Sequence, residues 1–338
     1  MRFRRTSHLW IALLVILLLV TGIQAHVPLI GGDNEALETA TYIDDPLKSW
    51  AIYGELRDAA VVNYYRFDME QGQRLRLMLF TPEEELFTPG LVIMGPRIEP
   101  QGTVPSIVTV PQGAGAMVVE GKRPERASYE PFTPASQFEL VDIDLNVLAS
   151  GTYYVAVYEP LQGGPYGLAL GYKEEFSLVE WIRVPLDVIR IHQWEGQSLA
   201  FILAPLLAVL ACGFSLLFWQ RKKGASVPQN TFGWIGSFIS FLYLGSGAIM
   251  FTQMAIALTR TTLSPAVIVT IIFALLPVIA GVIMVRVALS VQGKIETKAR
   301  LKIAILGILG LFIWAGLVIG PVIAVVASLL LYSQKNQT

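Results

Sequence analysis

Short runs in which apolar and polar residues alternate fill the first half of the chain and predict β-strands. In the segment 60–69, Tyr65 and Phe67 fall on one side of a strand, while Tyr64 and Arg66 fall on the other. Further runs of this kind cover residues 75–80, 91–94, 116–119, 138–143, 153–158 and 166–172. Short β-branched and aromatic runs divided by Gly and Pro predict an antiparallel β-sandwich.

Long apolar runs replace this alternation in the second half of the chain. They cover residues 199–219, 232–258, 265–287 and 303–332. Because a spanning helix needs about 20 mostly apolar residues, the pattern predicts a bundle of four transmembrane helices. Gly316 and Gly320 form a Gly-x-x-x-Gly pattern in the last run, which favours close helix packing within the chain or against a partner. The expected class is an α+β multi-domain membrane protein, with an antiparallel β-sandwich beside the helices.

An amphipathic segment, residues 174–198, joins these two halves. Trp181 and Trp194 lie toward its two ends, and Pro185 divides it. Tryptophan is enriched where a protein meets lipid headgroups, so we expect an interfacial connector.

The first 25 residues have the pattern of a secretory signal. Arg2, Arg4 and Arg5 precede an apolar run over residues 9–20, which is short for a spanning helix. Ile23 and Ala25 suit the −3 and −1 positions of a cleavage site. We expect cleavage after Ala25, with a retained, tilted anchor as the alternative.

Charge is distributed very unevenly. Of 338 residues, 54% are hydrophobic and the net charge is only −1. Residues 26–198 hold 25 of the 26 acidic and 12 of the 25 basic residues, which leaves the remainder basic. An acidic exposed part argues against a nucleic-acid partner. The basic clusters 221–223 and 294–302 predict cytoplasmic loops by the positive-inside rule, with the sandwich and the C-terminus outside.

Several strand sequences resemble the bacterial and archaeal pre-peptidase C-terminal (PPC) family. They are "NEALETA", "WAIYGEL", "VNYYRFDMEQGQRLRLMLF", "SGTYYVAVYEP" and "GGPYGLALGY", and the likeness covers residues 33–172. The resemblance implies a jelly-roll-like or immunoglobulin-like β-sandwich over residues 26–173. Members are often accessory domains of secreted enzymes, and some bind calcium or extracellular polymers.

The residues needed for common catalytic centres are scarce. The sequence has three histidines, His8, His26 and His192, and one cysteine, Cys212, which excludes a disulfide within the chain. It contains no Gly-x-Ser-x-Gly, no His-Glu-x-x-His and no phosphate-binding Gly-x-x-x-x-Gly-Lys loop. We therefore expect a protein that is not an enzyme.

We expect no cofactor. The alternatives are that the chain binds copper or calcium. An N-terminal His26 would offer copper an amine and an imidazole, with His192 as a second ligand. The simpler alternative for His26 is that it is the first residue of a flexible tail. The simpler alternative for His192 is that it is a polar residue at the membrane interface. Calcium would use Asp142 and Asp144, which share a strand face, or the acidic residues near 33–45. A solvated acidic face is the simpler alternative.

These observations predict a membrane-anchored extracytoplasmic binding or adaptor protein, or an accessory subunit of a membrane complex. Its partner would be a protein or an extracellular ligand. A metal-handling protein that uses His26 and a sensor that relays ectodomain binding to a membrane partner are the alternatives. The Pro- and Gly-rich segment 99–134 is expected to be a long loop, either functional or disordered.

Overall fold

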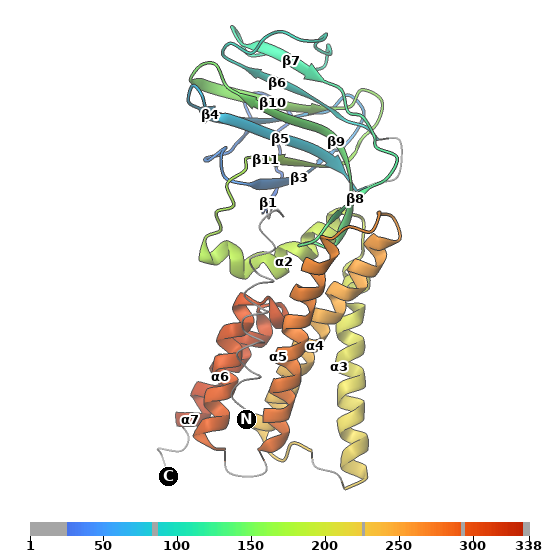
Figure 1. The fold of residues 1–338 in the computed structure, drawn as a ribbon, viewed down its shortest axis with the longest axis vertical. Helices are drawn as coiled ribbons and strands as arrows, with labels where there is room; N and C mark the ends of the chain where they lie inside the picture. The colour runs from blue at the N-terminus through green and yellow to red at the C-terminus, as the bar shows by residue number, and fades with distance from the viewer. Residues whose placement is uncertain (1–25, 83–86, 225–226, 292–294, 334–338) are drawn as a thin grey trace.

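A β-sandwich stands on a group of helices, as the computed structural model of the chain shows (Figure 1). The structure describes residues 26–82, 87–224, 227–291 and 295–333. The predicted signal peptide or anchor, residues 1–25, lies outside the described residues. The expected α+β class, with a sandwich and a separate helical part, is confirmed.

Two sheets form the sandwich. The first has six strands in the order β1 (Val27–Ile30), β3 (Trp50–Leu56), β11 (Gly164–Leu170), β5 (Arg74–Thr81), β9 (Ala135–Asn146) and β8 (Ser128–Glu130). The second has five, in the order β2 (Thr41–Tyr42), β4 (Val62–Met69), β10 (Gly151–Tyr158), β6 (Gly90–Gly95) and β7 (Gly115–Val119). Neighbouring strands are antiparallel except in two pairs at the sheet edges, β1–β3 and β2–β4, which are parallel.

The alternation in the sequence matches the packing between the sheets. Tyr65 and Phe67 of β4 are fully buried, whereas Arg66 between them is exposed. Buried hydroxyl groups need partners. The hydroxyl oxygens of Tyr65 and Tyr166 lie 2.6 Å apart, and Asn63 Nδ2 donates to Tyr166 Oη at 2.8 Å. The core therefore contains a satisfied polar network inside an apolar layer.

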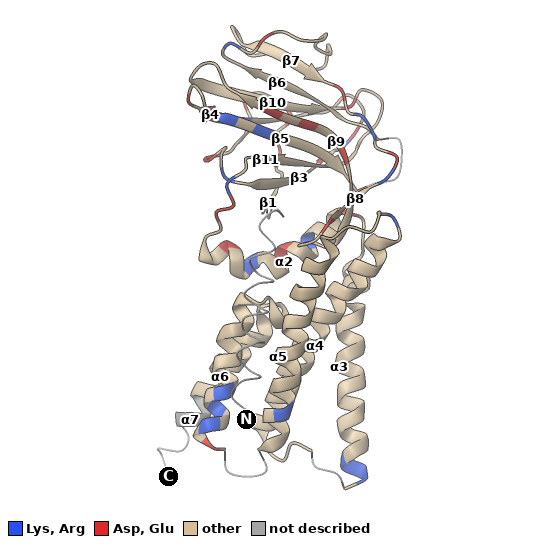
Figure 2. Cartoon of the chain, viewed as in Figure 1, with Lys and Arg blue, Asp and Glu red and all other residues tan. Residues whose placement is uncertain are grey.

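Three helices are long and apolar enough to cross a membrane: α3 (Leu199–Lys222), α4 (Thr231–Leu258) and α5 (Val267–Ser290). They match the first three predicted spans within a few residues. The side chains of Ser198 and Asn230 cap α3 and α4 by accepting backbone N–H groups of the first turn. Figure 2 shows the charged residues of the helices from α3 onward gathered near the end far from the sandwich.

The prediction of a single helix over 303–332 is wrong. The chain forms α6 (Thr297–Phe312), a short 3₁₀ turn η1 (Ala315–Leu317) and α7 (Ile319–Ser333), and it reverses direction at the turn (Figure 1). A Cβ added to Gly307 would lie 2.8 Å from Ala324 Cβ, and one added to Gly310 would lie 3.0 Å from Pro321 Cγ. These contacts are those of an antiparallel hairpin, so α7 returns to the end of the bundle from which α6 started.

Left-handed backbone conformations cause this reversal. Trp314, Leu317 and Val318 have φ values of 56°, 54° and 67°, and Gly316 has a φ of 64°. Such conformations are costly for residues other than glycine and persist where contacts hold them. The Gly316 N–H donates to Ser246 Oγ of α4 at 3.0 Å. The turn depends on these backbone conformations and on a hydrogen bond from α4, so it could not be predicted from the apolar composition of the run.

Gly316 and Gly320 both pack inside the molecule. Gly316 lies in the turn and Gly320 in α7, so the two do not lie on one continuous helix face as the Gly-x-x-x-Gly pattern suggests. A Cβ at Gly316 would lie 2.8 Å from the Tyr243 ring, and one at Gly320 would lie 2.9 Å from it. The small residues let the hairpin approach α4 closely.

Helix α2 (Leu178–Trp194) lies crosswise between the sandwich and the other helices (Figure 1). Pro185 does not divide it, because the helix continues on both sides of the proline. A proline has no N–H to bond the carbonyl four residues earlier, which here belongs to Trp181. That carbonyl instead accepts the indole N–H of Trp314 at 3.0 Å. The indole of Trp181 in turn donates to the carbonyl of Phe312 at 3.0 Å, so α2 and the hairpin turn are joined reciprocally.

Candidate functional site at the junction of sandwich and helices

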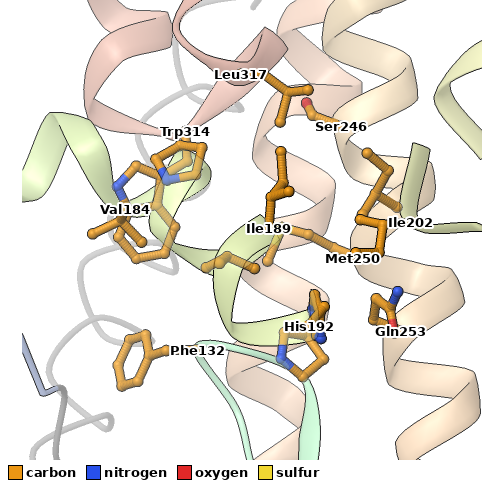
Figure 3. Close-up of a pocket in the computed structure, with 14 residues that line it drawn as sticks. Phe132, Val184, Ile189, His192, Ile202, Ser246, Met250, Gln253, Trp314 and Leu317 are labelled. Carbon is orange, nitrogen blue, oxygen red and sulfur yellow. The ribbon is translucent and has the colours of Figure 1, made fainter. Parts of the chain in front are cut away.

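An apolar cavity lies where the sandwich, α2 and the membrane helices meet (Figure 3). We refer to it as the junction cavity. It has about 520 Å³ of empty space, including its open mouth. Its walls come from α2, α3, α4, the hairpin turn and the loop after β8, and include Phe132, Val184, Ile202, Ile249, Trp314 and Leu317. Apolar walls with a few polar groups are typical of small-molecule sites.

His192 places a polar group on this apolar wall. Its side chain is only 1% exposed, and its Nδ1 lies 2.7 Å from Glu195 Oε2. Among the described residues, His192 Nε2 and Glu195 Oε1 are buried without a hydrogen-bond partner. Figure 3 shows His192 and Gln253 toward one end of the cavity, with Leu317 at the other.

A second, more polar cavity adjoins the first. We refer to it as the polar cavity. It shares Pro134 and Gln253 with the junction cavity and is also lined by Glu195, Gln197 and Arg260. The two glutamine amides bond reciprocally, at 2.7 Å and 2.9 Å, and so link α4 to the segment between α2 and α3. A continuous wall therefore passes from apolar to polar.

A third, basal cavity lies under the sandwich and is lined by three titratable groups, His26, Tyr53 and Glu130. Burial, helped by the charge of Arg76, lowers the pKa of His26 from 6.5 to about 4. Burial raises the pKa of the Glu130 carboxyl from 4.5 to about 7, although the backbone N–H groups of Phe132 and Thr133 favour its charged form. Both groups are therefore stabilised in their neutral forms by folding.

These shifts predict opposite pH dependences. Glu130 contributes stability below pH 4.5 that is lost as the pH rises through about 7. His26 contributes stability above pH 6.5 that is lost as the pH falls through about 4. Each single variant should show the pH dependence of the group that remains. In Glu130→Gln, where His26 remains, the unfolding free energy should rise by about 2 kcal/mol from pH 4.5 to 6.5. In His26→Gln, where Glu130 remains, it should fall by a similar amount.

Thermal unfolding in detergent, followed by tryptophan fluorescence across this pH range, measures both slopes. The double variant is the control and should have a nearly flat profile. Slopes of the same sign in the two single variants would contradict the assignment.

Strand β8 and the loop after it connect the sandwich to α5. The hydroxyl of Tyr129 lies 2.7 Å from Thr270 Oγ1, which itself donates to the carbonyl of Pro131 at 2.6 Å. The ring of Phe132 packs against Phe273, with centroids 5.7 Å apart. This part of the segment 99–134 is therefore an ordered contact with the helices.

Helix α2 is bonded to the sandwich near both of its ends. Lys48 Nζ lies 2.7 Å and 2.9 Å from the two carboxylate oxygens of Glu180. At the other end, Trp194 Nε1 donates to the carbonyl of Gly54 at 2.8 Å, and its ring meets Tyr53 edge-on with centroids 4.9 Å apart. The two tryptophans expected at the headgroups, Trp181 and Trp194, thus donate to backbone carbonyls of the hairpin and of the sandwich.

The predicted copper ligands are not brought together. His26 Nδ1 lies 2.6 Å from Ser49 Oγ in the basal cavity, while His192 lines the junction cavity. The flexible-tail interpretation of His26 is also wrong, because the next residues pair with β3 as strand β1. Within the described ranges, no group of three or more His, Cys, Asp or Glu residues is placed to hold a metal ion.

The predicted calcium residues face arginines. Asp142 and Asp144 lie on β9, and each forms an ion pair with β5, to Arg76 and Arg74 respectively. Arg74 Nη2 lies 2.6 Å from Asp144 Oδ2, and this hydrogen bond lowers the pKa of the Asp144 carboxyl. Both aspartates lie on the surface and pair across neighbouring strands.

Of the cavity residues, the sequence singled out His192, as a copper ligand or an interfacial polar residue, and not as part of a cavity wall. Gln253 carries a local signal, because it is a polar side chain within an apolar run. Phe132 and Trp314 carry no such signal, since their positions depend on a loop and on a turn that join parts distant in sequence.

The chain matches no model of a known protein family and no curated protein. Among solved structures, it is similar to the pre-peptidase C-terminal domain of a collagenase from Bacillus anthracis. The identity is 16%, the TM-score is 0.22, and the alignment covers 41% of this chain and 97% of that one. A TM-score this low carries no argument about the fold. The description of the fold as a sandwich rests on the strand pairing given above.

Proposed function

We propose that the chain is a membrane-anchored extracytoplasmic binding or adaptor protein, without catalysis of its own, that acts as an accessory subunit of a membrane complex. The observation that carries the proposal is the bonded junction. The sandwich contacts the helices through Tyr129, Lys48 and Trp194, which are far apart in the sequence. A partner that displaces the sandwich would therefore also displace α2 and α5. This coupling also supports the related role of a sensor that relays binding to a membrane partner.

The hairpin changes the proposed topology. Because α7 ends where α6 begins, we propose that the C-terminus lies with the basic loops in the cytoplasm and not outside. In this arrangement Lys335 joins the cytoplasmic positive charges, and Arg260 is the one basic residue left between the membrane segments on the other side. The acidic sandwich would be outside.

A reporter fused to the C-terminus tests this topology. We expect a fluorescent protein that matures only in the cytoplasm to be bright after residue 338 and inside the loop 223–230. The same reporter in the loop 259–264 should be dark. A dark C-terminal fusion with a bright 223–230 fusion would contradict the hairpin.

Copurification in a mild detergent tests the function. We expect a reproducible stoichiometric protein partner by mass spectrometry of the tagged full chain. Trp194→Ala is the matched variant, because it weakens the sandwich contact and leaves the spans intact. A partner that couples to the docked sandwich should be recovered in a lower amount with this variant. A lone monomer in every preparation would contradict the accessory-subunit proposal.

The copper alternative has less support from the geometry. The Nδ1 atom that would chelate together with an N-terminal amine is engaged by Ser49, and the ring is enclosed. Equilibrium dialysis of the purified protein against micromolar copper tests this alternative directly.

A further inference from the structure

We propose that the junction cavity and the polar cavity together hold one membrane lipid, with an acyl chain in the first and a hydrogen-bond-donating headgroup in the second. The inference rests on the proposed function, since it names a ligand for the junction that couples the sandwich to the helices. Phosphatidylethanolamine is the simplest lipid with this chemistry.

The walls of the junction cavity are apolar, as a site for a hydrocarbon chain requires. Val184, Ile202, Ile249 and Leu317 line it together with aromatic rings. Ser246 also lies on the wall, but its hydroxyl donates to the carbonyl of Tyr243 and accepts the Gly316 N–H. Its polar capacity is therefore used within the protein. Apolar cavities of this kind bind apolar molecules in preference to water.

The polar end of the cavity offers an acceptor that no described protein group satisfies. A carboxylate accepts hydrogen bonds, so the contact with Glu195 Oε2 places a proton on His192 Nδ1. The two polar atoms left are His192 Nε2 and the second oxygen of Glu195, and that oxygen is an acceptor. Both are buried without a partner among the described residues. Because unpaired buried acceptors are costly, the complementary ligand carries N–H or O–H groups at this point.

The neighbouring cavity provides room and charge for the rest of a headgroup. Glu195 lines it on one side, and Arg260 brings a guanidinium to the same space. A zwitterionic phosphoethanolamine group places a phosphate and an ammonium close together, which matches a cation and a carboxylate on one wall. Phosphatidylcholine has the same phosphate and net charge as phosphatidylethanolamine, but its headgroup has no N–H. Comparing the two lipids therefore separates the effect of hydrogen-bond donation from that of charge.

Such a lipid would contact all the parts that meet at the junction. Phe132 and Pro134 come from the sandwich loop, His192 from α2, Ile249 from α4 and Leu317 from the hairpin turn. A ligand that binds only the docked arrangement stabilises it by mass action. Lipid occupancy would therefore set how firmly the sandwich is held.

Native mass spectrometry of the full chain in detergent tests the proposal. Phosphatidylethanolamine, phosphatidylglycerol and phosphatidylcholine with identical acyl chains are titrated separately. We expect one retained lipid for the first two, which carry N–H or O–H donors, and about tenfold weaker binding of phosphatidylcholine. Equal binding of all three, or no retained lipid, would overturn the proposal.

Two variants locate the site. Glu195→Gln keeps an oxygen for His192 Nδ1 and presents an N–H donor where an acceptor was, so the preference over phosphatidylcholine should disappear. Val188→Phe fills the junction cavity and should weaken all three lipids about tenfold or more. Leu186→Phe, on the exposed face of the same helix, is its control and should have no effect. Unchanged binding in both site variants would overturn the location.

The source of the lipid and the proposed function are tested separately. Lipid extracted from protein purified directly from membranes should be enriched in the donor-bearing class relative to the bulk membrane, and no enrichment would overturn a membrane source. A negative lipid result leaves the partner experiment unaffected, because that experiment detects proteins.

Discussion

Trp194→Ala should release the sandwich from α2. The indole of Trp194 donates to the carbonyl of Gly54, and its ring lies 4.9 Å and 6.3 Å from the ring centroids of Tyr53 and Phe80. Removing a fully buried tryptophan typically costs about 3–5 kcal/mol, and the partly buried Trp194 should cost somewhat less. Most of this loss should fall on the docked arrangement, since Trp194 lies outside the main core of the sandwich.

Hydrogen exchange of the full chain in lipid nanodiscs measures this loss. We expect faster exchange of β3 and of the C-terminal half of α2, while β4 and β10 stay protected. Trp194→Phe keeps most of the packing and should have a smaller effect. Trp219→Ala is the negative control, because that side chain is 53% exposed near the far end of α3. Unchanged protection in Trp194→Ala would show that the sandwich is held by other contacts.

Gly316→Ala should destabilise the hairpin by about 2–3 kcal/mol. Part of the cost comes from the left-handed φ of 64°, which costs a residue with a Cβ roughly 1–2 kcal/mol. The rest comes from the new Cβ, which would lie 2.8 Å from Cδ1 of Tyr243. Because Tyr243 is fully buried and donates to the carbonyl of Leu306 at 3.0 Å, its ring has little freedom to move away.

Thermal unfolding of the purified chain measures this effect, with an expected fall in midpoint of roughly 5–10 °C. Gly224→Ala separates the two causes. Gly224 has a similar φ of 71°, but a Cβ there would meet no atom within 4 Å, so only the strain remains. Equal effects of the two substitutions would show that the contact with Tyr243 does not matter.

The sequence predicts elements whose signal is local. Strand β4 follows from the alternation around Tyr65 and Phe67, because the period of two is a property of the strand itself. The spans α3, α4 and α5 follow from apolar composition and length. Neither signal depends on what the element packs against, which is why these predictions agree with the structure.

The hairpin and the junction were missed because their causes are not local. Trp314, Leu317 and Val318 adopt left-handed conformations that their residue types disfavour, and a hydroxyl from α4 helps to hold the turn. A continuous apolar run looks the same whether the chain goes straight or reverses. The contact of Tyr129 with Thr270 likewise joins residues 141 positions apart, and neither side chain is unusual in its own segment.

Pro185 shows how a local defect becomes a means of recognition. Its missing N–H leaves one carbonyl of α2 without a helical partner, and the indole of Trp314 donates to that carbonyl. Pro185→Ala would restore an N–H that competes for the same oxygen. An isolated peptide of α2 would then become a better helix, while in the whole protein the bond between that helix and the hairpin turn would weaken. The helix alone favours an N–H at this position, whereas the folded protein uses the Trp181 carbonyl to bind the Trp314 indole. Local and global preferences therefore conflict at Pro185, and the fold follows the global one.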